Sequence, residues 1–317
     1  MDIALIAVGC VLFLLSPVIA AAYVCYRMAF YQNPVKNIPD PFRHIKNDGS
    51  EFSNFSRSLV ENILKEPYEE VFITAHDGTK LCGRLYLRDE SRPFAIQAHG
   101  YRSTPMTDFS GGGALALELG FNVIMIDQRA HGKSAGRTIT FGVKESLDIF
   151  SWIKFVSNRW GEDREIILQG ISMGAATVII AAAHPLPKSV KGIMADCPYS
   201  DGESIIKKVI SGMKLPPRLT YPIVRLGGRI FGRFDIGNAD CVTAAKKSQV
   251  PILLIHGEAD AFVPCDMSRK IAEDAPMVEL HTFPDAHHGT SFIVDVEKYK
   301  MLVSKFCSDV LNDEKYK

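Results

Sequence analysis

Five residues with the spacing Gly-x-Ser-x-Gly, Gly170 to Gly174, carry the clearest chemical signal in this sequence. They directly follow an apolar run, Ile166-Ile167-Leu168, and precede a stretch with helical periodicity. Between a strand and a helix, this spacing forms a strained turn that exposes the central serine. The spacing therefore predicts that Ser172 is a nucleophile at the N-terminus of a helix, whose dipole favours developing negative charge.

A serine hydroxyl is a poor nucleophile at neutral pH, so it needs a histidine base that a carboxylate orients. Both residues are expected to follow the serine in the chain. Asp260, in a loop just after an apolar run, is favoured as the acid over its neighbour Glu258, and Asp196 is an alternative. The base is His287 or His288, which lie in one loop and which the residue pattern alone does not separate.

Acyl transfer also needs two backbone N–H groups directed at the oxygen that gains negative charge in the transition state. The N–H of Met173, which follows the serine, is the first expected donor. The loop after the apolar run 94–98 begins His99-Gly100-Tyr101, and by its position the N–H of Tyr101 is the second donor. His99 is expected to brace this loop and not to act as a base. Chemistry of this kind needs no metal and no organic cofactor.

The residues above lie at the ends of short apolar segments that alternate with helical ones. A hairpin is predicted over residues 71–87, with a turn at His76 to Thr79. Six further strands are expected at 94–98, 122–126, 165–168, 192–195, 252–255 and 278–282. Because helical stretches separate most of these apolar runs, the pattern predicts an α/β fold with a mostly parallel sheet and helices on both faces. Function is then expected at the carboxyl ends of the strands.

One long segment interrupts this alternation between the strands expected at 192–195 and 252–255. It is too long for a simple crossover, so a small helical cap is predicted at about 198–240. Its second part places four arginines among large apolar residues: Arg218, Arg225, Arg229 and Arg233. We expect a cap helix that covers the active site with its arginines solvated. The alternative is a face that lies against anionic lipid.

The charge balance and the cysteines exclude several classes of protein. The 36 basic and 36 acidic residues of the 317-residue chain cancel, which gives no reason to expect binding to nucleic acid. The seven cysteines form no CxxC pair and have no histidine at metal-site spacing. They therefore predict neither a structural zinc nor a disulfide framework.

The N-terminal segment has a different character, because residues 3–26 contain no charged side chain. About 20 such residues suffice to cross a bilayer as a helix, which predicts a retained anchor at 1–28 that contacts membrane lipid. A cleaved signal peptide, with its cleavage site at Ala20 to Ala22, is the alternative, but no Lys or Arg precedes the run. Basic residues such as Arg27 and Lys36 follow the helix, which predicts a cytoplasmic location for the rest of the chain.

Five ordered motifs together resemble the α/β-hydrolase superfamily over about residues 69–312: His99-Gly100, the D-x-R-x-H-G-x-S segment Asp127 to Ser134, Gly170 to Gly174, the Asp260 loop and the histidine loop. The chain is most similar to membrane-anchored bacterial members related to the serine aminopeptidase S33 and esterase-like branches. The family's usual form has Gly or Ala after the catalytic histidine, which selects His288 over His287. The resemblance also implies that Asp127 to Ser134 is a structural loop beside the pocket, so that His131 is not catalytic.

The motifs and the resemblance together imply a serine hydrolase that forms an acyl-enzyme through Ser172, Asp260 and His288. A carboxylic ester, short-acyl or lipid-like, is the expected substrate, and a peptide is the alternative because the same residues serve both bonds. A non-catalytic, membrane-tethered binding protein is a minor alternative, since such proteins usually lack one of the three residues. The expected domains are the anchor, a juxtamembrane linker with a short helix at 29–66, and a hydrolase domain at 67–317.

Overall fold

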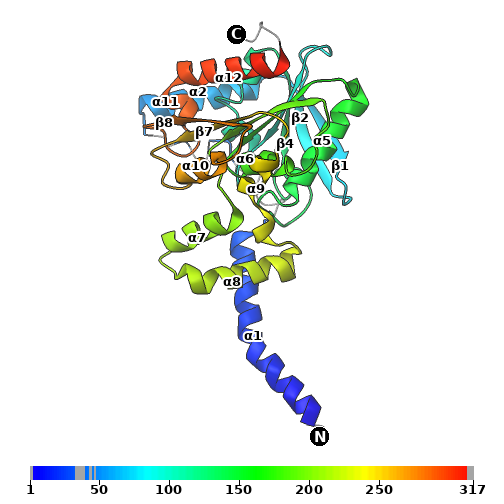
Figure 1. Cartoon of the computed structure of the whole chain (residues 1–317), viewed down its shortest axis with the longest axis vertical. Helices are drawn as coiled ribbons and strands as arrows, with labels where there is room; N and C mark the ends of the chain where they lie inside the picture. Colours follow the sequence, from blue (N-terminus) through cyan, green and yellow to red (C-terminus); the bar gives the residue numbers. More distant parts are fainter. Residues whose placement is uncertain (1–2, 33–39, 43–44, 46–47, 313–317) are drawn as a thin grey trace.

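A computed structural model describes residues 3–32, 40–42, 45 and 48–312, with side chains described from Ser16 onward. Its centre is an eight-stranded sheet with the strand order β1-β2-β4-β3-β5-β6-β7-β8 (Figure 1). The strands are β1 (Glu69–Thr74), β2 (Lys80–Tyr86), β3 (Phe94–Ala98), β4 (Asn122–Asp127), β5 (Ile166–Ile171), β6 (Val190–Asp196), β7 (Ile252–Gly257) and β8 (Val278–Phe283). β2 pairs antiparallel with both β1 and β4, and every pair from β4 to β8 is parallel. The predicted hairpin and the mostly parallel sheet are therefore confirmed.

Helices cover both faces of this sheet, as the apolar strands require. The helices of the described chain, of which α1, α7 and α8 lie away from the sheet (Figure 1), are α1 (Ile3–Ala29), α2 (Glu51–Lys65), α3 (Pro105–Asp108), α4 (Leu115–Glu118), α5 (Glu145–Trp160), α6 (Met173–Ala181), α7 (Gly202–Gly212), α8 (Pro217–Gly227), α9 (Cys241–Lys247), α10 (Asp266–Ala272), α11 (Ser291–Val294) and α12 (Val296–Leu311). In β4, Ile124 and Ile126 join the core beneath α5 and α6, while Val123 and Met125 join the core beneath α4 and α12. Because successive side chains of a strand point to opposite faces, the strand must be apolar throughout.

The predicted insertion is a helical lobe, residues 202–234, made of α7, α8 and the π-helical turn η2 (Gly228–Gly232). In Figure 1, α8 runs across the C-terminal half of α1. A Cβ added to Gly227 would lie 2.3 Å from the carbonyl oxygen of Ala22, so the two backbones touch. Ala22, Tyr26 and Phe30 of this part of the chain are buried. The lobe therefore encloses the end of α1.

This packing corrects the predicted position of the insertion over the active site. Among the described residues, none from 198–240 lines the cavity that contains Ser172. The apolar face of α8 that was expected to cover the active site contacts α1 and α7 instead. The helix α2, at the end of the predicted linker, takes the place beside the cavity.

The predicted anchor and linker fall partly outside the described residues. Within the part of the chain that was described, no helix is long and apolar enough to cross a membrane. The side chains of residues 1–15, which make up much of the predicted anchor, lie outside that part. So do linker residues 33–39, 43–44 and 46–47. The anchor and its orientation therefore stay predictions.

Candidate active site

Ser172 lies on the sharp turn between β5 and α6, with φ +56° and ψ −117°. A positive φ in a residue other than glycine stores backbone strain and is typical of functional sites. The turn depends on its two glycines. A Cβ on Gly170 would lie 2.2 Å from the carbonyl oxygen of Gly174, and one on Gly174 would lie 1.7 Å from that of Ala98. The backbone N–H of Ser172 donates to the carbonyl of Asp196 at 2.8 Å, which fixes the turn against β6.

Loops after β7 and β8 bring an acid and a histidine to this serine. His288 Nε2 lies 2.9 Å from Ser172 Oγ, and His288 Nδ1 lies 2.6 Å from Asp260 Oδ2. The other carboxylate oxygen of Asp260 accepts the backbone N–H groups of Phe262 and Val263, at 2.9 and 2.8 Å. Ser172 and Asp260 are 88 positions apart in the sequence, and Asp260 and His288 are 28 positions apart. The three residues nevertheless form one continuous hydrogen-bonded chain.

The neighbouring candidates take other partners. The Nδ1–H of His287 donates to the carbonyl of Ala259 at 2.9 Å. Glu258 forms an ion pair with Arg269 at 3.2 Å, on the outside of the loop. The geometry thus separates the two adjacent histidines, which the residue pattern alone could not do, and it brings His288 to the serine.

Hydrogen bonding keeps the Asp260 carboxylate charged. Burial by itself would raise the pKa of Asp260, but hydrogen bonds from His256 and His288 and from the Val263 N–H outweigh burial and hold this pKa below its usual range. An ionised Asp260 at neutral pH keeps a proton on Nδ1 of His288 and leaves Nε2 free to accept one. This is the tautomer that a base acting on the serine hydroxyl requires.

A buried cysteine completes a group with the spacing of metal ligands. Cys197 Sγ and ligand atoms of Asp260 and His288 lie within 4.8 Å of one another. However, burial raises the pKa of Cys197 well above its usual value, so the sulfur is a thiol and not a thiolate. The other two ligand atoms already bond each other. This set of donors fits a proton relay better than a metal site.

Two backbone N–H groups, those predicted to bind an oxyanion, have no partner in the described structure. Neither the N–H of Tyr101 nor that of Met173 has a hydrogen-bond acceptor within the described part of the chain. The N–H of Gly100, the residue before Tyr101, donates to the Asp108 carboxylate at 2.6 Å. A Cβ on Gly100 would lie 3.3 Å from Ser172 Cβ, so the loop passes directly over the serine.

Two buried histidines hold this loop from behind. His99 donates from Nδ1 to the Gly100 carbonyl at 2.8 Å and accepts the Gln128 N–H on Nε2 at 3.2 Å. His131 Nε2 accepts the backbone N–H of Arg102 at 3.0 Å. Burial lowers the pKa of His131 to about 4 and holds that of His99 well below its ordinary value. Both rings are therefore neutral, and their hydrogen bonds brace this loop.

The end of α1 and the residues just after it also contact the loop that follows β3, a connection that sequence reasoning missed. The Tyr101 hydroxyl donates to the carbonyl of Ala29 at 2.9 Å. The Arg102 guanidinium donates to the carbonyls of Met28 and Tyr31, at 2.9 and 3.1 Å. The carbonyls of Met28 and Ala29 are free to accept because a helix leaves its last C=O groups without intrahelical partners, and Tyr31 lies just after the helix. The N-terminal segment thus helps to position the loop that carries the Tyr101 N–H.

A cavity of about 640 Å³ lies beside the serine and the histidine. The helix α2 forms one wall with Phe52, Ser53, Ser56 and Leu59. The other walls include apolar side chains: Ile171, Phe262, Phe292 and Ile293. Among the described lining residues are three aspartates and no lysine or arginine: Asp48, Asp108 and Asp196. The cavity therefore favours an apolar or cationic group over an anionic one.

Asp196 is the most deeply buried of these carboxylates. Its Oδ2 accepts the Tyr299 hydroxyl at 3.2 Å, whereas its Oδ1 has no hydrogen-bond partner in the described structure. Burial raises the pKa of Asp196 to about 6, although nearby His256 and the Tyr299 hydroxyl oppose the shift. Ionising this group in the folded protein is thus unfavourable.

We expect Asp196 to make folding stability depend on pH. Because its folded pKa is raised, its stabilising contribution is present below about pH 4 and is lost as the pH rises through about 6. Asp196→Asn, which cannot ionise, should therefore gain in melting temperature relative to the native protein as the pH rises from about 4.5 to 7.5. Scanning calorimetry across this range tests the expectation. A difference in melting temperature that is constant with pH would contradict it.

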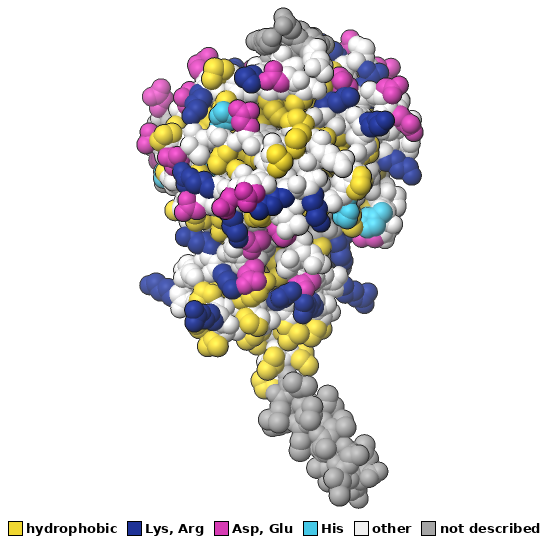
Figure 2. All heavy atoms as spheres, viewed as in Figure 1, with side chains coloured by type: hydrophobic (Ala, Val, Ile, Leu, Met, Phe, Trp, Pro, Cys, Tyr) yellow, Lys and Arg dark blue, Asp and Glu magenta, His cyan; other side chains and the backbone are white. Residues whose placement is uncertain are grey.

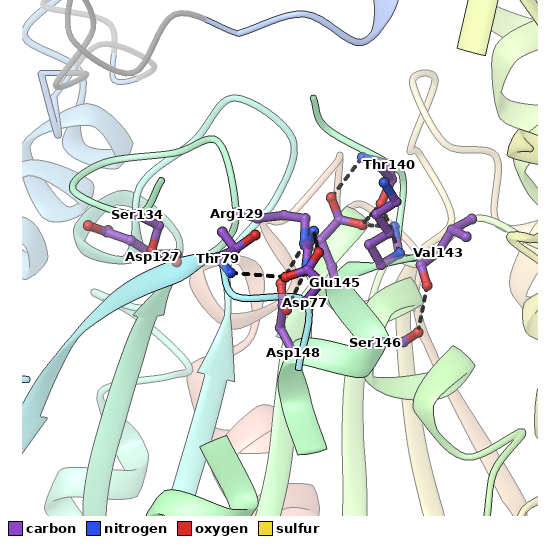
Figure 3. Close-up of polar contacts among 12 residues, drawn as sticks. Asp77, Thr79, Asp127, Arg129, Ser134, Thr140, Val143, Glu145, Ser146 and Asp148 are labelled. Carbon is purple, nitrogen blue, oxygen red and sulfur yellow. Dashed lines mark hydrogen bonds and ion pairs between the residues drawn. The ribbon is translucent and has the colours of Figure 1, made fainter. Parts of the chain in front are cut away.

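The loop after β4, which begins after Asp127, is held in place by ion pairs and hydrogen bonds. Figure 3 shows Arg129 directed at Asp148 on α5 and Asp77 in the β1–β2 turn. Arg129 Nε and Nη2 contact the two carboxylate oxygens of Asp148 at 2.7 and 2.5 Å, and Nη1 lies 3.0 Å from Asp77. Further along the loop, Ser134 Oγ donates to the carbonyl of Asp127 at 2.5 Å. The loop is thus tied to the ends of several elements, as the resemblance implied for a structural segment.

We expect Arg129→Met to destabilise the fold by about 3–5 kcal/mol, because it leaves the buried carboxylate of Asp148 without its cation. Urea denaturation measures this loss. The matched control is Arg159→Met, which removes a similar bidentate contact to Glu69 in an exposed position. That change should cost less than about 1 kcal/mol. Equal losses for the two variants would show that burial does not set the strength of the Arg129 pair.

The strand order, the turn after β5, the acid loop after β7 and the histidine loop after β8 together define a fold of the α/β-hydrolase class. A family model described as "alpha/beta hydrolase fold" matches residues 109–238. The Pyrococcus furiosus esterase Pf2001 superposes with a TM-score of 0.61 and 27% identity, over 78% of this chain and 95% of the esterase. The chain thus has the α/β-hydrolase fold and is similar to members of the α/β-hydrolase superfamily.

Two of the proteins that match by sequence do so over part of their length. The uncharacterized protein YqkD of Bacillus subtilis is 26% identical over 202 residues, which are 63% of this chain and 66% of YqkD. The thiohydrolase aneE of Aspergillus aculeatus is 33% identical over 143 residues, 44% of each chain. The matched segment thus covers less than two thirds of either relative.

Proposed function

We propose that this protein is a serine hydrolase that cleaves carboxylic esters through an acyl-enzyme on Ser172. The observation that carries the proposal is the continuous relay from Ser172 Oγ through His288 to Asp260, with contacts of 2.9 and 2.6 Å. The apolar walls of the cavity favour a short-acyl or lipid-like acyl group. The similarity to a Pyrococcus esterase and to a fungal thiohydrolase supports acyl-group chemistry.

In this mechanism His288 Nε2 takes the proton of Ser172 as its oxygen attacks the ester carbonyl. The N–H groups of Tyr101 and Met173 stabilise the tetrahedral oxyanion, and Asp260 stabilises the imidazolium. The imidazolium then protonates the departing alcohol, which leaves the acyl group on Ser172. Water, deprotonated by the same histidine, attacks the acyl-enzyme and releases the acid and the free serine.

Labelling with a fluorophosphonate tests this proposal. The native protein should form a covalent adduct on Ser172, and Ser172→Ala should not, because the alanine has no oxygen to phosphonylate. Intact-mass spectrometry measures the adduct. A matched control is Ser110→Ala, since Ser110 also lines the cavity but contacts neither His288 nor Asp260. Equal labelling of the native protein and Ser172→Ala would show that another residue is the nucleophile.

A serine peptidase is the second candidate, and one observation favours it. The three aspartates that line the cavity, with no lysine or arginine among the described lining, suit the amino group of a peptide. Asp196 is the most relevant, because one of its oxygens has no partner in the described structure. Comparing p-nitrophenyl esters with aminoacyl-nitroanilides at equal concentration separates the two activities. A higher kcat/KM for the nitroanilides would favour the peptidase.

We also propose that residues 1–28 anchor the protein in a membrane with the hydrolase domain in the cytoplasm. The uncharged run of residues 3–26 and the basic residues after it support this proposal. Alkaline carbonate extraction of membranes should leave the full-length protein in the membrane fraction. Protease added to sealed, right-side-out cells should leave the domain intact, and digestion of the domain would contradict the proposed orientation.

A further inference from the structure

The lobe carries a second apolar face that no part of the described chain covers. Tyr221, Val224 and Gly228 form the buried side of α8 and η2. On the other side, Leu219 and Ile230 are 72% and 46% exposed. The exposed or half-buried Pro222 and Leu226 continue this row at helical spacing: Leu219, Pro222, Leu226 and Ile230. The helix is therefore apolar on two sides, although only one packs against the described part of the chain.

The exposed row is continuous with exposed apolar side chains on neighbouring elements. Met213 and Leu215, in the turn before α8, are 49% and 44% exposed. Val18 and Ile19 of α1, which lie just N-terminal to the α8 contact at Ala22, are each 42% exposed. Figure 2 shows hydrophobic side chains gathered along the end of the lobe from which α1 emerges, with Lys and Arg around them. Large contiguous apolar patches of this kind mark interaction sites.

The charge of the lobe identifies the kind of partner. Residues 202–234 contain seven basic residues and one acidic residue, Glu203, in a chain whose net charge is zero. Arg225 and Arg229 pair with Asp235, and Lys207 pairs with Glu203. Four cations have no acidic partner within the described residues: Lys208, Lys214, Arg218 and Arg233. Cations beside an apolar stripe suit an anionic lipid surface, where the stripe enters the interface and the cations contact headgroups.

The orientation of the helices agrees with this partner. α8 runs across α1, so a bilayer entered by α1 along its axis would lie roughly parallel to α8 (Figure 1). We propose that the exposed face of the lobe, formed by α8, η2 and the turn before α8, lies on the surface of an anionic phospholipid bilayer. The lobe is thus a membrane-docking element and not a lid over the active site. This inference is independent of the hydrolytic activity.

The test measures the position of α8 relative to lipid in the full-length protein. Leu219→Trp is reconstituted in vesicles of brominated phosphatidylcholine, with or without an equal amount of phosphatidylglycerol. Bromine quenches tryptophan only at close range, and Trp152 and Trp160 give the same background in all variants. The matched control is Met301→Trp, because Met301 is 62% exposed on α12, at the opposite end of the molecule from α1 (Figure 1).

We expect the tryptophan at 219 to be quenched at least about twofold more than the one at 301, and more strongly when phosphatidylglycerol is present. Adding Lys214→Glu and Arg218→Glu should abolish the effect of phosphatidylglycerol, whereas Lys154→Glu, an exposed change on α5, should not. Equal quenching at positions 219 and 301 would overturn the proposal. So would concentration-dependent dimers in detergent that Leu219→Asp dissociates, since the face would then bind a second copy of the chain.

Discussion

Replacing His288 with alanine is expected to lower kcat for ester hydrolysis by about 10⁴- to 10⁶-fold. Without the imidazole, Ser172 Oγ has no base within hydrogen-bonding distance, and the leaving alcohol has no proton donor. Because substrate still binds the same cavity walls, KM should change much less than kcat. Steady-state kinetics with a p-nitrophenyl ester measure both constants.

The adjacent histidine provides an unusually close control. His287→Ala should change kcat by less than about tenfold, because its ring bonds the Ala259 carbonyl and does not reach the serine. The two variants remove the same side chain from neighbouring positions of one loop. A larger loss for His287→Ala than for His288→Ala would mean that the relay uses the other ring. Circular dichroism of both variants checks that the loop change leaves the fold intact.

The second large effect concerns the backbone of the serine turn. Gly174→Ala is expected to destabilise the protein by about 3 kcal/mol or more, because the new Cβ would meet the Ala98 carbonyl oxygen at 1.7 Å. Neither atom can yield easily, since one belongs to α6 and the other to the end of the central strand β3. Urea denaturation measures the loss, and a failure to accumulate folded protein would be its extreme form.

A glycine in open space serves as the control for this change. A Cβ on Gly212, the last residue of α7, would meet nothing within 4 Å. Gly212→Ala should therefore leave stability unchanged or raise it by up to about 1 kcal/mol, because alanine restricts the unfolded chain. If Gly174→Ala cost no more stability than Gly212→Ala, this result would contradict the close contact between α6 and β3.

The sheet and the serine turn were predictable because local sequence determines them. Strands buried on both faces must be apolar, and the turn at Ser172 needs small residues at positions 170 and 174 whatever surrounds it. The acid and the histidine were located by chain order and by the strands that precede them. The choice between His287 and His288 needed family resemblance, because one position along a loop redirects a side chain in a way that no periodicity reveals.

The partners of the two N-terminal helices were not predictable in the same way. The partner of α1 is α8, which has apolar residues on two sides. Nothing in the spacing of these residues tells which side packs against another helix. The close contact between Gly227 and Ala22 decides this, and it joins segments about 200 residues apart. For α2, serines at 53 and 56 on its buried side were the available signal, since small polar residues suit a cavity wall better than a packed core.

The hydrogen bonds from Tyr101 and Arg102 to the end of α1 have a practical consequence for enzymology. Biochemists often remove an apolar N-terminus to obtain a protein that is easier to purify. A version of this protein that begins after residue 32 would lack all three carbonyl acceptors of those bonds. In the mechanism proposed above, its turnover numbers would describe a catalyst with a loosened oxyanion site, so rates intended for physiological comparison should come from the longer polypeptide.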